Sequence, residues 1–374
     1  MNRSLRGNNI LTILSLGCFL LLTIFSCDNE TVKSEPDPVT GPNLMTPCEN
    51  GLAGIYPCND YDLMAHLPIS TFGATSGNDS WGWTDPTTGK EIALICSTHG
   101  TAFVDLTDPT APILLGKLAS ANPGHSGNTW RDVKTYNNHA FIVSEASGHG
   151  MQVFDLTRLR NVTNAPETFT PDAHYTGFGS AHNIVINETS GYAYIVGSDT
   201  NGGGPLFINI QNPTNPTMEG SFSGYSHDAQ VVTYNGPDAD YAGDEILITS
   251  NANELVIANI TDKANPTTIA TVTYNNIGYV HQGWFTEDLR YFILGDELDE
   301  QRFGNKTRTI VFDFADLDIP KQHFIYNGTT QAIDHNGYVK GNQFFLANYT
   351  AGLRVLDISD IENKNVTCDL VEVE

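Results

Sequence analysis

The sequence contains few positively charged residues. Its 374 residues include 18 lysines and arginines against 43 aspartates and glutamates, which gives a formal net charge of −25. A surface of this charge repels phosphate backbones and anionic lipid headgroups, so we expect no nucleic-acid partner. Charged residues make up only 16% of the chain, and the 34 glycines and 15 tyrosines are typical of an all-β exported domain.

No apolar run is long enough to cross a bilayer. The longest run, residues 10–25, has sixteen residues and follows a basic start, whereas a spanning helix needs about 20. This pattern predicts a secretory signal over residues 1–26. The signal ends in Ile24-Phe25-Ser26-Cys27, which resembles a bacterial lipobox. We therefore expect Cys27 to be lipidated and to hold the chain on a membrane; the alternative is an ordinary signal with a chance cysteine.

Residues 27–45 are polar and contain three prolines, which indicates a solvated tether before a folded domain over residues 46–374. Asp28-Asn29-Glu30 directly follows the lipobox cysteine and resembles the surface-export signal of Bacteroidetes lipoproteins. This resemblance implies an exported lipoprotein on the outer membrane or cell surface of a Gram-negative, Bacteroidetes-like bacterium.

Cysteines are also few, and two of the six lie at or before the lipobox. In an oxidising compartment we expect Cys48 and Cys58 to form a disulfide across a short loop, with two free thiols as the alternative. Cys96 and Cys368 either pair with each other or stay apart.

The common signatures of catalysis are missing from the sequence. There is no Gly-x-Ser-x-Gly elbow, no His-Glu-x-x-His pair, no phosphate loop and no Cys-x-x-Cys pair. An active site assembled from distant segments stays possible, because such a site leaves no local motif.

One internal repeat organises the chain. A short apolar strand ends in Asp or Asn and runs into a polar turn, and successive copies lie 44–54 residues apart. The copies occupy residues 102–106, 152–156, 206–210, 256–260, 310–314 and 354–358. This spacing and the β-rich composition predict an all-β fold, a single β-propeller with six four-stranded blades. A pair of β-sandwiches is the alternative. We further expect residues 62–69 to pair with the last blade and close the ring.

Several segments resemble the choice-of-anchor B family, whose members carry LVIVD-type repeats. These segments are residues 81–86, 144–152, 180–187, 281–284 and 295–300. The resemblance extends over about residues 46–374. It implies a propeller domain attached to the cell by one of several devices, of which a lipobox is one, and it implies no particular activity.

Five of the six expected blades begin with a polar pair, in a strand that should line the central axis. The pairs are Arg131-Asp132, His182-Asn183, His227-Asp228, His281-Gln282 and His335-Asn336. Four histidines would therefore ring one mouth of the channel. We expect His99, His149, Asp132, Glu145, Asp228, Asp296 and Glu297 to join them from neighbouring loops and strands.

Imidazoles beside carboxylates suit a transition-metal site for Zn, Cu, Fe or Ni, with His182, His227, His281 and His335 as ligands. Glu145 and Asp228 are the candidate catalytic residues, as groups that orient imidazoles or move protons. The alternative is a purely structural ring of hydrogen bonds in a wet channel. Calcium is a weaker candidate, because Asp238–Gly243 begins like a calcium loop but has Ala242 at the fifth position.

The four tryptophans, Trp81, Trp83, Trp130 and Trp284, lie at or near expected blade starts. They either pack between blades or stack on a ligand such as a sugar.

Two functions fit these patterns. The first is a surface-displayed module that binds an extracellular ligand or protein through the histidine-lined mouth. The second is a metal-dependent enzyme, a hydrolase or lyase, at the same mouth.

Overall fold

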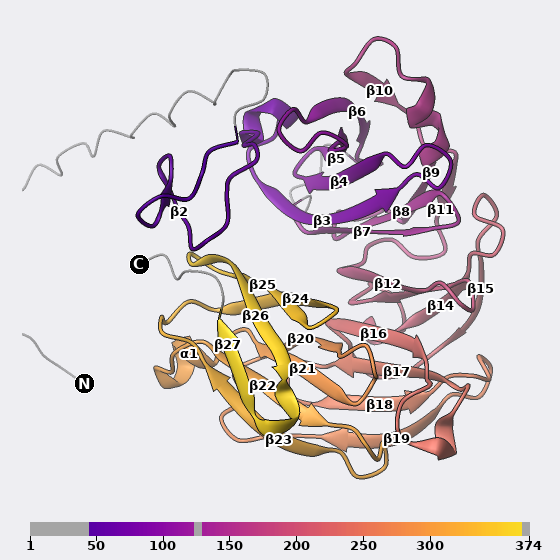
Figure 1. Ribbon diagram of the computed structural model, residues 1–374. Coiled ribbons are helices and arrows are strands. Elements are labelled where there is room, and N and C mark those ends of the chain that lie inside the picture. The colour runs from indigo at the N-terminus through magenta and orange to yellow at the C-terminus, as the bar shows by residue number, and fades with distance from the viewer. Residues whose placement is uncertain (1–44, 123–128, 369–374) are drawn as a thin grey trace, which may run out of the picture. The chain divides into compact units, whose positions relative to one another are not determined.

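The computed structural model describes residues 45–122 and 129–368, and nearly all of its regular structure is β-strand. Six antiparallel sheets follow one another along the chain and are arranged radially (Figure 1). The strands of the first three sheets are β3 (Gly77–Thr84), β4 (Glu91–Ser97), β5 (Gly100–Asp105) and β6 (Ile113–Ala119); β7 (Arg131–Tyr136), β8 (His139–Ser144), β9 (Met151–Asp155) and β11 (Ala173–Tyr175); and β12 (Asn183–Asn187), β13 (Tyr192–Val196), β14 (Leu206–Asn209) and β15 (Thr217–Ser221).

The last three sheets have the same order of strands. They are β16 (Asp228–Thr233), β17 (Glu245–Ser250), β18 (Leu255–Asn259) and β19 (Thr267–Val272); β20 (Val280–Phe285), β21 (Tyr291–Asp296), β22 (Arg308–Asp313) and β23 (Lys321–Asn327); and β24 (Asp334–Lys340), β25 (Gln343–Asn348), β26 (Gly352–Asp360) and β27 (Asn365–Cys368). A short strand, β10 (Glu167–Phe169), adds to the outside of the first sheet by pairing parallel to β6. This radial set of four-stranded antiparallel sheets confirms the predicted β-propeller fold class.

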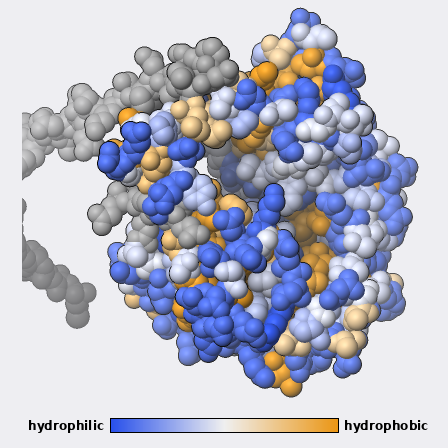
Figure 2. All heavy atoms as spheres, in the orientation of Figure 1, coloured by the Kyte–Doolittle hydropathy of each residue, from blue (hydrophilic) through white to orange (hydrophobic). Residues whose placement is uncertain are grey.

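The remaining elements are short. They are β1 (Leu52–Ala53), β2 (Tyr56–Pro57), the helix α1 (Asp299–Phe303), and the 3₁₀ turns η1 (Ile69–Phe72), η2 (Leu156–Asn161), η3 (Asn201–Gly203), η4 (Ala239–Tyr241) and η5 (Ile361–Asn363). None of these described helices is both long and apolar enough to cross a membrane. Hydrophilic residues cover most of the face seen in Figure 2, as the acidic composition leads one to expect.

The sequence repeat corresponds to the third strand of each sheet and to the turn that follows it. In each copy, an Asp or Asn accepts a hydrogen bond from the backbone N–H two residues later; it ends the third strand in five sheets and lies at a register shift within β26 in the sixth. The six acceptors are Asp105, Asp155, Asn209, Asn259, Asp313 and Asp357, at 2.8–3.0 Å. A short polar side chain that bonds its own backbone in this way fixes the turn, so the repeat retains Asp or Asn for a local physical reason.

The apolar core lies between consecutive sheets. Each sheet faces the next with buried aliphatic and aromatic side chains, and such clusters join the first sheet to the second and so on to the sixth. Between the first two sheets, for example, the rings of Phe103 and Phe154 stack with centroids 4.7 Å apart. The sixth sheet meets the first at the axis, where Tyr338 of β24 contacts Trp81 of β3 with ring centroids 5.6 Å apart.

The N-terminal segment does not complete the last sheet, contrary to the expectation for residues 62–69. The fourth strand of that sheet is β27, and residues 62–69 form only an isolated bridge between Leu63 and Thr46. Leu67 and Ile69 of this segment, with Phe72 of the following η1 turn, instead pack on Ala102 and Val104 of the first sheet; we call residues 62–72 the covering segment. Covering the face buries apolar side chains, whereas pairing the edge would satisfy backbone N–H and C=O groups. Both arrangements remove exposed surface from a terminal sheet.

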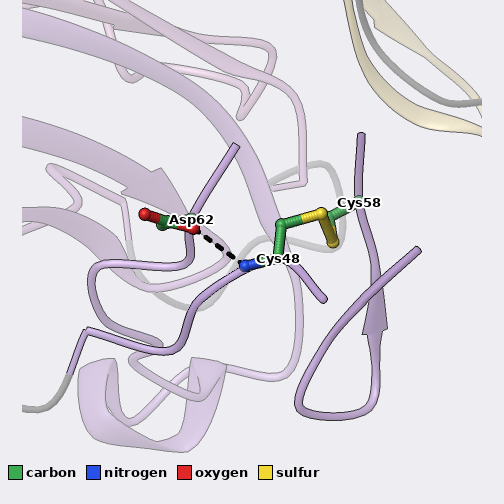
Figure 3. Close-up of a disulfide and its surroundings, with 3 residues drawn as sticks. All are labelled: Cys48, Cys58 and Asp62. Atoms are coloured by element: carbon green, nitrogen blue, oxygen red, sulfur yellow. Dashed lines mark hydrogen bonds between the residues drawn. A yellow bond between two sulfur atoms is a disulfide. The ribbon is translucent and has the colours of Figure 1, made fainter. Parts of the chain in front are cut away.

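Cys48 and Cys58 are joined by a disulfide just before this segment (Figure 3). The Cys48 backbone N–H also donates a hydrogen bond to Asp62 Oδ1 at 2.8 Å, which ties the disulfide loop to the start of the covering segment. Cys96 is a buried free thiol. Burial is the main cause that raises its pKa, so the thiol stays protonated and packs like a small apolar core residue.

The covering segment gives a stability test. Replacing Phe72 by Ala should lower the free energy of unfolding by about 3 kcal/mol, because it removes a buried aromatic ring and leaves a cavity against the first sheet. Chemical unfolding of the full chain followed by tryptophan fluorescence measures this. Met64 lies on the same segment but is 37% exposed, and Met64→Ala should change the stability by no more than about 0.5 kcal/mol. Equal effects of the two changes would show that the segment is not part of the core.

Candidate functional site

Four histidines from four consecutive sheets lie against one another at the axis. We call His182, His227, His281 and His335 the histidine arc. Each lies at the start of a first strand, β12, β16, β20 or β24. Neighbouring ring centroids are 4.2, 4.5 and 4.3 Å apart along the series. The structure therefore brings together the four residues that the sequence predicted as one cluster.

The arc forms because the first strands of consecutive sheets lie side by side and run in the same sense, so equivalent positions meet. Local irregularities then point the rings inward. Register shifts between Val280 and Gln282 and between Asp334 and Gly337 allow two successive residues to face the axis. Gly197 provides room at the other end of the arc, since a Cβ there would lie 2.6 Å from His182 Cβ.

Carboxylates flank the arc at two places. His182 Nδ1 donates a hydrogen bond to Glu145 Oε1 at 2.5 Å, and His281 Nε2 lies 3.7 Å from Glu297 Oε2. Tyr349 closes this side, because its hydroxyl donates to Glu297 Oε1 at 3.1 Å and its ring contacts His335. Both carboxylates that the sequence placed at the mouth in loops, Glu145 and Glu297, therefore reach the arc.

Two tyrosines that the sequence analysis missed complete the arc. The hydroxyls of Tyr225 and Tyr279 lie 3.3 and 3.1 Å from His227 Nδ1 and 3.2 Å from each other. A signal for them existed, because each stands two residues before an arc histidine, in Tyr225-Ser226-His227 and Tyr279-Val280-His281. A tyrosine at the same distance before two arc histidines is a repeated feature, even though the residue between them differs (Ser226 in one copy, Val280 in the other).

The middle of the arc is buried and electrically neutral. Burial lowers the pKa of His227 to about 2 and that of His281 well below its usual range, and neighbouring histidines lower both further. Burial likewise lowers the pKa of His335 to about 4. These imidazoles are therefore uncharged near pH 7, which is the form that binds metal ions.

Two ring nitrogens of the arc have no hydrogen-bond partner among the described residues. They are His227 Nε2 and His281 Nδ1, and both are buried. When His227 Nδ1 donates to the tyrosine oxygens, the lone pair of the ring lies on Nε2, the nitrogen without a partner. Ligand atoms of His227, His281 and Glu297 also lie within 4.8 Å of one another. Small side-chain shifts would bring them to the separation of roughly 3–4 Å expected around one tetrahedral ion.

A layer of charged side chains lies next to the arc along the channel. Lys134 Nζ donates to Asp132 Oδ1 at 2.5 Å and lies 3.6 Å from Asp79. Burial lowers the pKa of Lys134, but Asp132 and Asp79 outweigh this effect and hold the pKa well above its usual range. Burial, reinforced by Asp132, raises the pKa of Asp228 to about 7. Asp132 and Asp228 thus belong to this layer, and the prediction that placed Asp132 beside the histidines is corrected accordingly.

Of three other predicted residues, two have partners elsewhere and the third is exposed. Buried His149 accepts a hydrogen bond from Arg131 at 3.0 Å and donates one to the Gly150 carbonyl, so it supports the second sheet. His99 is exposed at the turn between β4 and β5. Asp296 accepts hydrogen bonds from Tyr274 and from the backbone of residues 278 and 279, and it holds a loop in place. Position in the repeat suggested these residues, but the side chains of His149 and Asp296 bind local partners instead.

The acidic segment after β21 contains a buried pair of carboxyl groups. Asp299 accepts a hydrogen bond from Arg308, whereas both carboxyl oxygens of buried Glu300 lack a partner among the described residues. Burial raises the pKa of Glu300, and the adjacent Asp299 raises it further. Burial raises the pKa of Asp299 as well, but its bond to Arg308 opposes that rise, so Glu300 is the carboxyl group of the pair that keeps a proton more readily.

Comparison with known protein families finds one matching repeat. The LVIVD repeat matches residues 178–223, which include all four strands of the third sheet. No curated protein matches the sequence.

Solved structures with the same arrangement of strands include three from distant organisms. The periplasmic gluconolactonase of Pseudomonas aeruginosa has a TM-score of 0.55 at 11% identity, with 79% of this chain and 85% of that one covered. A hypothetical selenium-binding protein of Sulfolobus tokodaii has a TM-score of 0.53 at 8% identity over 75% of each chain. A Lactobacillus plantarum protein has a TM-score of 0.51 at 14% identity over 78% and 80%. At such identities the likeness concerns the fold alone.

Glu300 gives a pH-dependent test. Its raised pKa means that the folded chain keeps a proton that the unfolded chain releases above about pH 4. Glu300 therefore makes stability fall as the pH rises, by up to about 1 kcal/mol per pH unit. Glu300→Gln should remove this slope, so the variant should gain stability over the wild type between pH 5 and pH 8. Chemical unfolding at both pH values measures the difference.

The control is Glu49→Gln, since Glu49 is exposed and its replacement should change stability by no more than about 0.5 kcal/mol at either pH. A Glu300→Gln variant that is less stable than the wild type at pH 8 would mean that Glu300 is ionised and paired in the folded chain.

Proposed function

We propose that the chain is an exported, lipid-anchored propeller of six blades, of the choice-of-anchor B type, whose histidine arc binds a divalent transition metal ion. The ion would make this mouth of the channel the binding site for an extracellular ligand or protein. One observation carries the proposal: two buried, neutral imidazoles, His227 and His281, each have a ring nitrogen without a described partner, and ligand atoms of both rings and of Glu297 lie within 4.8 Å of one another.

A purely structural ring of histidines explains this arrangement less well. In such a ring each buried nitrogen would donate to or accept from a neighbour, because a buried polar atom without a partner costs about 1–3 kcal/mol. A metal ion bound by one of these nitrogens removes that cost at the bound atom. His227, His281 and Glu297 would form the ligand set, with His182 and His335 on either side. Imidazole and carboxylate favour Zn, Cu, Fe or Ni, whereas calcium prefers an all-oxygen set.

The anchor is the second part of the proposal. The signal over residues 1–26 and the lipidated Cys27 lie outside the described residues, as does nearly all of the 27–45 tether. The predicted lipobox supports attachment to the outer membrane or cell surface. The disulfide between Cys48 and Cys58 supports an oxidising compartment, in which such bonds persist.

A metal-dependent enzyme at the same mouth is the second candidate, and the Glu145–His182 pair favours it. These two side chains are more exposed than the buried middle of the arc, with 38% and 17% of their surfaces accessible. A carboxylate that accepts from an imidazole at 2.5 Å can hold that ring as a proton acceptor for a substrate in the mouth. A bound ion would supply Lewis acidity or an ionised water for hydrolysis.

The metal proposal predicts about one transition-metal ion per chain. The tag-free full chain should retain it after reconstitution and dialysis, as measured by elemental analysis. Exchanging both His227 and His281 for Ala should abolish retention, because it removes the two buried ligands, while circular dichroism shows the β-fold intact. The control, His99→Ala, changes an exposed histidine outside the arc and should retain the ion. A wild-type chain that retains no ion, or equal retention by the double variant, would contradict the proposal.

The enzyme candidate makes a separate prediction. Zinc-loaded wild type should hydrolyse p-nitrophenyl acetate or δ-valerolactone at least tenfold faster than Glu145→Gln, with equal zinc in both, because the variant loses the carboxylate that orients His182. Equal rates, or none above buffer, would leave the binding module as the function of the mouth.

A further inference from the structure

The other end of the channel holds a second cavity, of about 160 Å³. Its walls include Trp81, Thr135, Gln230 and Trp284, which lie in the middle or last part of the first strands, whereas the arc lies at their starts. From His281 to Trp284 a strand advances about 10 Å. The charged layer of Lys134 and Asp132 lies between the two ends, so this cavity is separate from the histidine arc.

Two tryptophans shape the cavity and are held there by a third aromatic ring. Tyr338 contacts both edge to face, with ring centroids 5.6 Å from Trp81 and 4.9 Å from Trp284. Neither indole N–H has a hydrogen-bond partner among the described residues, and neither is fully buried. Trp83 behaves differently: it is buried in the core between sheets, and its N–H donates to Asn138. Trp81 and Trp284 also pack against the core on one side, but both are only partly buried and line the cavity with indole N–H groups that have no described partner.

Polar groups alternate with these apolar surfaces. The Gln230 side-chain oxygen accepts from the Phe285 backbone N–H at 2.8 Å, which fixes the amide and leaves its NH₂ group without a described partner. The Thr135 hydroxyl also has no described partner, and exposed Glu188 stands in the wall as an acceptor. The cavity thus offers donors and acceptors at its edges and aromatic faces between them.

The charge of the cavity excludes an anion. Lys134 lines it, but its ammonium is neutralised by Asp132 at 2.5 Å. Glu188 adds a negative charge, and the chain as a whole carries −25. A phosphate or carboxylate ligand would meet net repulsion, whereas a neutral ligand would meet none.

We propose that this cavity binds one neutral pyranose ring, the terminal unit of a carbohydrate. A cavity of about 150 Å³ holds one benzene ring, so 160 Å³ accommodates the ring of a single pyranose while part of its hydroxyl rim stays in solvent, as a terminal unit allows. A pyranose has apolar C–H faces that stack on indoles and hydroxyl groups around its rim that match Gln230, Thr135, Glu188 and the two indole N–H groups. A planar aromatic ligand would fill the space but leave these polar groups unused. The inference does not depend on a metal ion in the histidine arc.

The test is a titration of the full chain in a detergent without a sugar headgroup, by ligand-observed NMR and tryptophan fluorescence. The probes are methyl β-D-glucopyranoside, methyl β-D-galactopyranoside and methyl α-D-mannopyranoside, with indole and glucose 6-phosphate as comparisons. At least one pyranoside should bind with a Kd of about 1–10 mM, the range of a small site with few contacts. Glucose 6-phosphate should bind more weakly than the neutral sugar.

Three variants locate the site. Trp284→Ala should weaken pyranoside binding at least tenfold, because it removes one stacking face. Thr135→Val keeps the shape of the side chain and removes only the hydroxyl, so it should weaken binding about threefold to tenfold without disturbing the fold. Trp130→Phe is the matched control, since Trp130 is half exposed and precedes the start of β7, at the opposite end of the strand from the cavity.

The binding of the three variants distinguishes support for the proposal from its rejection. Loss of binding in Trp284→Ala and Thr135→Val, with Trp130→Phe unchanged, supports the proposal. Three results would overturn it: no saturable pyranoside binding, binding that Thr135→Val leaves unaltered, or binding of indole alone. If Trp284→Ala does not fold, Thr135→Val still decides the question, because it makes the smaller change in the same wall.

Discussion

The central constraint on this molecule is that the first strands of all its sheets share one axis. Strands that lie side by side in the same sense bring equivalent residues of successive repeats into contact, so any polar residue kept at one repeat position becomes part of a layer. The channel therefore consists of layers along its length: histidines at the strand starts, then Asp79, Asp132, Lys134 and Asp228, then Trp81, Trp284 and Tyr338. Residues that are far apart in the sequence, and that form no local motif, therefore meet at the axis because they occupy equivalent positions of the repeat.

The charged layer places an ammonium and carboxylates in the interior, and the fold must offset the hydration that these groups lose. A buried ammonium or carboxylate loses its hydration, and the loss is tolerable only with a close partner and further hydrogen bonds. Lys134 has that environment, with Asp132 at 2.5 Å, a backbone carbonyl and the Trp81 ring 4.5 Å away. Asp132 in turn accepts from the backbone N–H of Ile184 on the next sheet. The ion pair thus links the second sheet to the third at the axis, where little apolar surface is available for packing.

Much of this arrangement could be predicted from the sequence, because it repeats. The Asp or Asn at or near the end of each third strand marks a turn with a fixed hydrogen bond, and that mark alone located six copies. The four arc histidines followed from the same register. The sequence did not predict side-chain partners where several neighbours are within reach. His149 bonds to Arg131, and Asp296 accepts hydrogen bonds within its own loop. The prediction that residues 62–69 pair with the last sheet was also wrong. An apolar segment beside a sheet can pair with the edge of the sheet or cover its face, and its composition is the same in both cases.

The two ends of the channel differ in the ligands that their electrostatics allow. At the histidine end, burial lowers the pKa of His227 and His281 and keeps these two imidazoles uncharged, so they do not oppose a cation, and Glu145 and Glu297 attract one. At the aromatic end, the single ammonium is already paired and a free carboxylate stands in the wall, so no positive charge remains for an anion. The overall charge of −25 adds to both effects, because it raises the local concentration of cations and repels anions. The two proposals therefore place a cation at one mouth and a neutral, hydroxyl-bearing ring at the other, with a layer that is balanced in charge between them.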